Sequence, residues 1–182
     1  MKHILKPAFS LFIIAAIITT GLVISFELTK EPIARQIKKT QEKTMKEVLP
    51  EAFEYREIET EKTGNIVRVF EGLKNGEITG YVVELAPEGY SGKINMMVGI
   101  SKAEEKITGM RVLRHTETPG LGALAVKENF YRRFDGKALS PLNVVKVLPG
   151  PNDIEAITAS TITTRAVTNA VNEAIKWYGD VK

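Results

Sequence analysis

The feature that most constrains this chain is an uncharged apolar run near its N-terminus, from Pro7 to Phe26. At a rise of about 1.5 Å per residue, a helix of this length spans about 30 Å, the thickness of the hydrocarbon core of a bilayer. Its few Ser and Thr residues do not form the polar stripe that a helix of a soluble domain normally shows. The run therefore predicts a transmembrane anchor over residues 7–26.

A cleaved signal peptide is the competing interpretation of this run. Signal peptides usually have an apolar stretch of about 7–15 residues that ends in a small-x-small cleavage site. Neither feature fits well here, so a retained anchor is favoured. Lys2 and Lys6 precede the run, and positive charge on this side favours a cytoplasmic N-terminus over residues 1–6. We therefore expect a single pass through the cell (inner) membrane, with the rest of the chain extracytoplasmic.

The composition excludes several kinds of site. The 182 residues include no cysteine and two histidines, which excludes disulfides, thiol nucleophiles and Cys-ligated zinc or iron–sulfur centres, and leaves no His-rich metal site. The formal net charge is +3, but outside the first 26 residues 23 basic residues are matched by 22 acidic ones. A nucleic-acid-binding surface needs a clear excess of positive charge. We therefore expect neither a metal site nor a nucleic-acid partner.

Residues 27–50 are expected to form a helical stalk. Pro32 suits the first turn of a helix that continues to about Val48, and Leu49-Pro50 ends it. The apolar residues of this stretch form only a thin stripe, which consists of Ile33, Ile37, Met45, Val48 and Leu49. A stalk between the bilayer and the next domain is favoured over a helix that binds a partner.

Residues 51–182 are predicted to form one α+β domain. Strands are expected over residues 66–70, 78–85, 92–100 and 107–113, where apolar residues alternate or cluster between turn signals such as Asn75-Gly76. An antiparallel sheet needs cover for its apolar face, and we expect that cover from helices over about 122–134 and 163–178. The predicted fold class is therefore α+β: an antiparallel sheet covered by helices, preceded by one transmembrane helix and a helical stalk.

A cluster of hydroxyl side chains lies at the start of the last predicted helix. Its five members occupy seven residues and are Thr158, Ser160, Thr161, Thr163 and Thr164. One hydroxyl is enough to cap the free N–H groups in the first turn of a helix. Five hydroxyls also make a donor-rich site where the helix dipole favours negative charge, as a phosphate ester requires. Helix capping and phosphate binding are equally consistent with these residues.

Two glycine-containing turns complete the set of unusual segments. Residues 115–122 read His-Thr-Glu-Thr-Pro-Gly-Leu-Gly, in which Pro119-Gly120 suits a type II turn. Residues 88–94 place Tyr90 between two glycines. A connection between two elements explains each segment, although Tyr90 also suits a place beside a flat aromatic ring.

In this order, the three segments resemble the FMN-binding domain family. The match comprises Gly-Tyr-x-Gly at residues 89–92, Glu-Thr-Pro-Gly-Leu-Gly at 117–122 and Thr-Ala-Ser-Thr at 158–161 before a C-terminal helix. Within that family, the chain is most similar to the G subunits of Rnf-type complexes, and the C subunits of Na⁺-translocating NADH:quinone reductases are related. The family pattern at the third segment is Ser-Gly-Ala-Thr. Ala159 therefore stands at the family's glycine, and Thr161 at its flavinylated threonine.

The resemblance implies a covalently bound FMN, whose phosphate a separate flavin transferase esterifies to Thr161. It also implies FMN contacts from the remaining hydroxyls and from the two turns: Thr158, Ser160, Thr163, Thr164, Glu117, Thr118, Gly120, Leu121, Gly122 and Tyr90. The implied role is electron relay within an ion-translocating ferredoxin:NAD⁺ oxidoreductase complex, with membrane, iron–sulfur and flavin subunits as partners. No residue is expected to be catalytic by itself.

Three other functions remain open at the level of sequence. The domain could be an anchored binding or sensor module without a redox role, in which the hydroxyls only cap a helix. It could also be a component like the C subunits of Na⁺-translocating NADH:quinone reductases. A different flavin-dependent reductase or regulator is disfavoured by the short chain and by its single predicted anchor.

Overall fold

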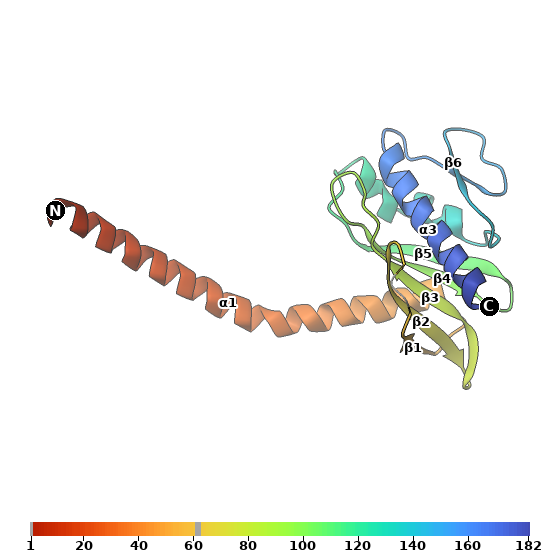
Figure 1. Cartoon of the computed structure of the whole chain (residues 1–182), viewed down its shortest axis with the longest axis horizontal. Helices are drawn as coiled ribbons and strands as arrows, with labels where there is room; N and C mark the ends of the chain where they lie inside the picture. The colour runs from red at the N-terminus through yellow and green to blue at the C-terminus, as the bar shows by residue number, and fades with distance from the viewer. Residues whose placement is uncertain (1, 61–62) are drawn as a thin grey trace. The chain divides into compact units, whose positions relative to one another are not determined.

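The chain begins with a single long helix. The structure, a computed structural model, describes residues 2–60 and 63–182, so Met1 of the predicted cytoplasmic N-terminus lies outside the described residues. Helix α1 (Lys2–Val48) is continuous and contains both Pro7 and Pro32 (Figure 1). Pro32 therefore lies inside a helix, whereas the sequence had suggested that a helix begins there. A proline there removes one backbone hydrogen bond, and α1 continues through it.

The fold divides into two compact units, the first ending at Thr40 and the second comprising Gln41–Lys182. The described residues of the first unit all lie in helix α1, whose last turns belong to the second unit. From Lys6 onward, α1 is long and apolar enough to cross a membrane. The large apolar side chains of the predicted span are exposed, among them Phe12 and Leu22. A helix that is apolar on all sides and uncovered by its own chain is typical of a lipid-facing segment.

The second unit is built on an antiparallel sheet of five strands in sequential order. They are β1 (Glu54–Ile58), β2 (Ile66–Lys74), β3 (Glu77–Leu85), β4 (Asn95–Ser101) and β5 (Lys106–Arg114). The predicted meander is confirmed, and β1 is an additional edge strand. β4 begins three residues later than expected, because Glu88 pairs with Lys93 in an isolated bridge and Gly92, at φ +143°, lies in the turn between them.

Helices cover one face of this sheet, as expected. The C-terminal helix α3 (Thr161–Val181) packs there through residues at helical spacing, including Val167, Ala170, Val171 and Ala174. The helix predicted over about 122–134 is divided into three short pieces, which are η1 (Gly122–Val126), α2 (Glu128–Tyr131) and η2 (Arg132–Phe134). Phe130 and Phe134 from these pieces enter the same core. Two short parallel strands, β6 (Asn143–Val145) and β7 (Asp153–Glu155), were not predicted.

The opposite face of the sheet is covered by the end of α1. Met45, Val48 and Leu49 form a second buried cluster with sheet residues that include Phe70 and Met97. These three residues were assigned to a thin stripe of a stalk, whereas Ile33 and Ile37 of the same stripe are exposed. The globular unit thus begins at Gln41, about ten residues before the expected boundary.

Glycines on the sheet allow the chain after α1 to approach the strands closely. A Cβ atom on Gly99 would lie 2.0 Å from the carbonyl oxygen of Val48, and one on Gly72 would lie 2.4 Å from a methyl group of Leu49. Both distances are far below van der Waals contact, so any larger residue would displace the end of α1. These glycines are the physical reason that the second cluster can form.

Candidate functional site

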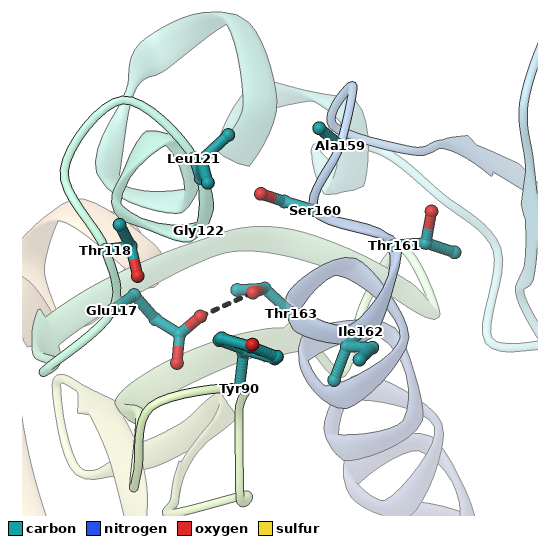
Figure 2. Close-up of a pocket in the computed structure, with 10 residues that line it drawn as sticks. All are labelled: Tyr90, Glu117, Thr118, Leu121, Gly122, Ala159, Ser160, Thr161, Ile162 and Thr163. Carbon is teal, nitrogen blue, oxygen red and sulfur yellow. Dashed lines mark hydrogen bonds between the residues drawn. The ribbon is translucent and has the colours of Figure 1, made fainter.

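Three segments that are distant in sequence meet around one pocket of about 410 Å³. They are the loop between β3 and β4, the turn between β5 and η1, and the start of α3 (Figure 2). The lining residues are Tyr90, Glu117, Thr118, Leu121, Gly122, Ala159, Ser160, Thr161, Ile162 and Thr163. The structure therefore brings together the three segments that stood out in the sequence.

Glu117 joins the three segments through hydrogen bonds. Its side chain is buried, with the residue only 5% exposed. One carboxylate oxygen accepts the backbone N–H of Ser91 at 2.8 Å, and the other accepts the hydroxyl of Thr163 at 2.5 Å. Figure 2 shows the second of these bonds crossing the floor of the pocket. Among the described residues, no Lys, Arg or His forms a salt bridge with this carboxylate. Glu117 is therefore held by neutral donors alone.

Two glycines make room for the Glu117 carboxylate. A Cβ atom on Gly89 would lie 2.5 Å from one of its oxygens, and a Cβ atom on Gly122 would lie 2.2 Å from the other. The Gly122 position is also 2.6 Å from the Thr163 hydroxyl. One glycine of each sequence motif, Gly89 in the first and Gly122 in the second, is thus explained by close approach to one buried acid. Glycine is required at these two positions because a Cβ atom would collide with the Glu117 side chain, whatever the conformation of the two turns.

The first turn of α3 presents unpaired backbone donors beside the pocket. Thr164 donates its N–H to the carbonyl of Ser160 at 3.0 Å, so the N–H groups of residues 161–163 have no acceptor within the helix. Ser160 stands at the N-cap position, and no side chain in the described part of the chain caps this end through a hydrogen bond. Such a helix end favours a negatively charged group. Helix capping was one of two equally consistent interpretations of the hydroxyl cluster. The structure does not support it, because no hydroxyl of the cluster forms a capping hydrogen bond at the start of α3.

Burial distinguishes the five hydroxyls from one another. Thr163 and Thr164 are buried, and the Thr164 hydroxyl donates to the Ser160 carbonyl while it accepts the N–H of Ile157. Thr158 is exposed and lies outside the pocket lining. Ser160 and Thr161 both line the pocket, but Ser160 is only 6% exposed. Thr161 is half-buried, and within the described part of the chain its hydroxyl has no hydrogen-bond partner. Of the five clustered hydroxyls, it is therefore the one that lines the pocket, is partly exposed and has no hydrogen-bond partner among the described residues.

The rim of the pocket is apolar and open to solvent. Tyr90 is 70% exposed, Ile162 55% and Leu121 40%, and each comes from a different one of the three segments. Large apolar side chains left exposed around a cavity are typical of a ligand site. Ile162 was not predicted as a site residue. The sequence does contain a signal for it, because Ile162 is the one large apolar residue in a first helical turn that otherwise consists of hydroxyl-bearing residues.

Three of the predicted contact residues do not line the pocket. Thr158 lies outside it, Thr164 is turned into the domain as described above, and Gly120 occupies the turn. Gly120 has φ +76°, and Leu121 donates its N–H to the Thr118 carbonyl at 3.2 Å. This geometry is the type II turn that the Pro-Gly pair predicted. Gly120 thus sets the direction of the chain, and its neighbours Thr118 and Leu121 face the pocket.

Comparison with known proteins gives consistent matches over both parts of the chain. A family model described as FMN-binding domain matches residues 89–176, and one described as RnfG N-terminal region matches residues 1–48. The G subunit of the Na⁺-translocating ferredoxin:NAD⁺ oxidoreductase complex of Acetobacterium woodii is 37% identical, over 97% of this chain and 92% of its own length. The G subunit of the ion-translocating oxidoreductase complex of Methanosarcina acetivorans is 30% identical, over 97% and 95%.

A solved structure shares the fold of the globular part. The crystal structure of the C subunit of the Na⁺-translocating NADH-quinone reductase from Parabacteroides distasonis superposes with a TM-score of 0.52 at 26% sequence identity. The match covers 61% of this chain and 60% of that one.

Proposed function

Because this chain belongs to the family of G subunits of ion-translocating oxidoreductase complexes and contains an FMN-binding domain, we propose that it carries FMN covalently on Thr161 and relays electrons within such a complex. The observation that best supports covalent attachment is the position of Thr161. It is the pocket hydroxyl that is both half-buried and free of an internal partner among the described residues, and it stands at the uncapped start of α3.

The residues of the pocket fit both ends of FMN. A phosphate ester at Thr161 would lie next to the free N–H groups of residues 161–163, where the helix dipole stabilises negative charge. The apolar rim formed by Tyr90, Leu121 and Ile162 suits the flat isoalloxazine ring. A volume of about 410 Å³ lies within the range of roughly 300–1,000 Å³ that is usual for ligand pockets.

The chain supplies binding and electrostatics, and bound FMN supplies the redox chemistry. Backbone N–H groups and the Ser160 hydroxyl hold the phosphate end. Apolar side chains at the rim exclude water from part of the ring, and the Glu117 carboxylate in the floor adds negative charge to its surroundings. A negative charge near the ring disfavours added electrons, so Glu117 would lower the reduction potential. A covalent bond prevents loss of the cofactor outside the cytoplasm.

Placement in the cell and maturation follow from the same proposal. The positive charges of Lys2 and Lys6 favour a cytoplasmic N-terminus, which puts the FMN domain on the extracytoplasmic side of the membrane. The partners are the other membrane, iron–sulfur and flavin subunits of the complex, and a flavin transferase attaches FMN to Thr161.

Mass spectrometry of the protein purified from its native membrane, or co-expressed with a flavin transferase, tests the attachment. Trypsin should release residues 147–165, which contain all five hydroxyls, as one peptide. We expect an FMN-sized mass increase on this peptide, with fragment ions that assign it to Thr161. Thr161→Val should abolish the increase, while the matched control Thr158→Val, which alters an exposed hydroxyl outside the pocket, should retain it.

Two outcomes would contradict the proposal. An adduct that persists in Thr161→Val would move the attachment to another residue. An unmodified wild-type peptide would favour an anchored binding or sensor module that uses the same pocket without covalent FMN.

A further inference from the structure

The loop that carries Tyr90 is tied to the neighbouring turn through one residue, Ser91. Its N–H donates to the Glu117 carboxylate at 2.8 Å, and its carbonyl accepts the Thr116 hydroxyl at 3.2 Å. Its own hydroxyl forms a longer hydrogen bond, at 3.4 Å, with the hydroxyl of Thr118. The Tyr90 ring itself is largely exposed. The position of Tyr90 beside the pocket is therefore set by the hydrogen bonds of Ser91 and not by burial of the ring.

The same carboxylate also holds the start of α3. Its second oxygen accepts the hydroxyl of Thr163 at 2.5 Å, and Thr163, which is fully buried, directly follows the rim residue Ile162. The backbone of Glu117 is fixed as well, because its N–H donates to Nδ1 of His115 at 3.1 Å. One buried side chain thus bonds the residue after Tyr90 and the residue after Ile162, which come from different segments of the pocket (Figure 2).

We propose that Glu117 is a positioning residue for the isoalloxazine ring. One of its oxygens holds Tyr90 in place through Ser91. The other holds Ile162 in place through Thr163. The sequence resemblance implied a direct contact between Glu117 and FMN, but both carboxylate oxygens are occupied by donors of the protein and the side chain is buried. The proposal rests on the proposed FMN site and deepens it, and it does not require the bond to FMN to be covalent.

The clamp formed by Glu117, Ser91 and Thr163 orders the pocket before FMN binds. A site that is already ordered loses less conformational entropy on binding and holds its ligand in one orientation. Each arm of the clamp also satisfies a polar group that would otherwise be left without a partner in a site with little access to water. The first role therefore predicts an effect on the bound ring, and the second predicts an effect on the flavin-free protein.

The hydrogen-bonding chemistry of this clamp allows positioning to be separated from charge. A carboxylate only accepts hydrogen bonds, whereas a glutamine amide accepts through its oxygen and donates through its nitrogen. In Glu117→Gln the oxygen can accept from Ser91 while the nitrogen donates to Thr163, because a hydroxyl accepts as well as donates. This variant keeps both bonds and removes the negative charge. Thr163→Val keeps the charge and removes one bond.

The test compares these two variants as full-length protein that carries FMN. The readout is the visible circular dichroism per flavin, because the flavin bands gain intensity when the ring is held in an asymmetric site. We expect Thr163→Val to lose most of this signal, towards that of free FMN, and Glu117→Gln to keep it. The reduction potential should rise in Glu117→Gln, because a negative charge near the ring is removed. Excess free FMN replaces the attached cofactor for a variant that carries none.

Two further variants of α3 are the matched controls. Thr163→Ser keeps the hydroxyl and should restore the dichroism that Thr163→Val loses. Thr168→Val removes another buried hydroxyl of the same helix, which donates to the Thr164 carbonyl at 2.9 Å and lies outside the pocket lining. Its dichroism should equal that of the wild type.

Hydrogen exchange of the flavin-free, full-length protein tests the clamp without the cofactor. In Glu117→Ala the amide of Ser91 loses its acceptor and should exchange about tenfold faster, a factor that corresponds to one hydrogen bond. Glu117→Gln should exchange like the wild type. Because this readout needs no FMN, failure of the clamp and failure of FMN attachment are distinguishable.

Several results would overturn the positioning role. Unchanged dichroism in Thr163→Val would show that the orientation of the ring does not depend on this bond. An equal loss in Thr168→Val would assign the effect to the general stability of α3. Loss of dichroism in Glu117→Gln with unchanged exchange at Ser91 would assign it to the negative charge of Glu117. Unchanged exchange at Ser91 in Glu117→Ala would show that the carboxylate does not hold the Tyr90 loop.

Discussion

At the scale of single residues, Ala159 has a backbone conformation that is unusual for its residue type. Its φ is +59°, a conformation that glycine adopts freely and alanine does not. Its side chain lines the pocket two residues before Thr161. The positive φ turns the chain into the first helical turn, so the glycine that the sequence resemblance leads us to expect at this position would adopt the same backbone without strain.

Ala159→Gly should therefore stabilise the protein. Relief of the left-handed strain gains about 1–2 kcal/mol, and the greater freedom of glycine in the unfolded chain costs about 0.5–1 kcal/mol. We expect the free energy of unfolding to rise by about 0.5–1 kcal/mol, measured by urea denaturation. The matched control is Ala166→Gly within α3, which should lower it by about 1 kcal/mol. A loss of stability in Ala159→Gly would contradict the strain.

At the scale of elements, Tyr55 on β1 fastens the end of α1 to the sheet. Its hydroxyl donates to the Leu49 carbonyl at 2.9 Å, just after the last residue of the helix. Burial raises the pKa of Tyr55 to about 12. The helix end, the edge strand and the second core are thus joined by one phenol that is neutral in the folded state.

This pKa predicts a loss of stability in alkaline solution. Above pH 10 the phenol ionises in the unfolded chain before it ionises in the folded one. The stability that its raised pKa contributes is therefore present below pH 10 and is lost as the pH rises towards about 12. Tyr55→Phe should lose about 1 kcal/mol at neutral pH, because one hydrogen bond is removed. It should also lose less stability than the wild type between pH 10 and 12.

Thermal unfolding at several pH values measures this effect. The wild type and Tyr55→Phe are compared at each pH value, and the difference between their alkaline slopes is attributed to the Tyr55 phenol. Identical slopes for Tyr55→Phe and the wild type would mean that the Tyr55 phenol does not ionise differently on unfolding.

At the scale of the whole molecule, the boundary between the two units decides which part folds by itself. The second unit starts at Gln41 and includes the last turns of α1. Met45, Val48 and Leu49 are at most 5% exposed, so they belong to the globular core. They do so although they lie at the end of α1, the helix that also contains the predicted anchor.

Truncation tests this boundary. A chain of residues 41–182 should fold, and one of residues 51–182 should be less stable by about 4 kcal/mol or more, because three buried apolar side chains are lost at about 1.5–3 kcal/mol each. A chain of residues 35–182 is the control and should match 41–182, since residues 35–40 are exposed. Urea denaturation compares the three. Equal stability of 51–182 and 41–182 would show that the second core contributes little.

Much of the fold could be predicted because its signals are local. The apolar run over 7–26, the alternating strands and the apolar face of α3 each reflect the period of one element, which neighbouring residues determine. The run Met96-Met97-Val98, buried on both sides of β4, was a usable sign that both faces of the sheet are covered. The expectation of a single covered face was wrong because the residues that cover the second face lie at the end of the helix that was predicted to be a stalk.

The sequence by itself determined the long apolar N-terminal helix, the sheet, the last helix and the three segments of the pocket, since each depends on residue types at fixed spacing. Only the tertiary structure decided which hydroxyl is available, that Glu117 and Thr163 share a hydrogen bond across 46 positions, and that the end of α1 belongs to the core. These properties depend on burial and on distances between remote segments. They arise when the whole chain packs, and no local period encodes them.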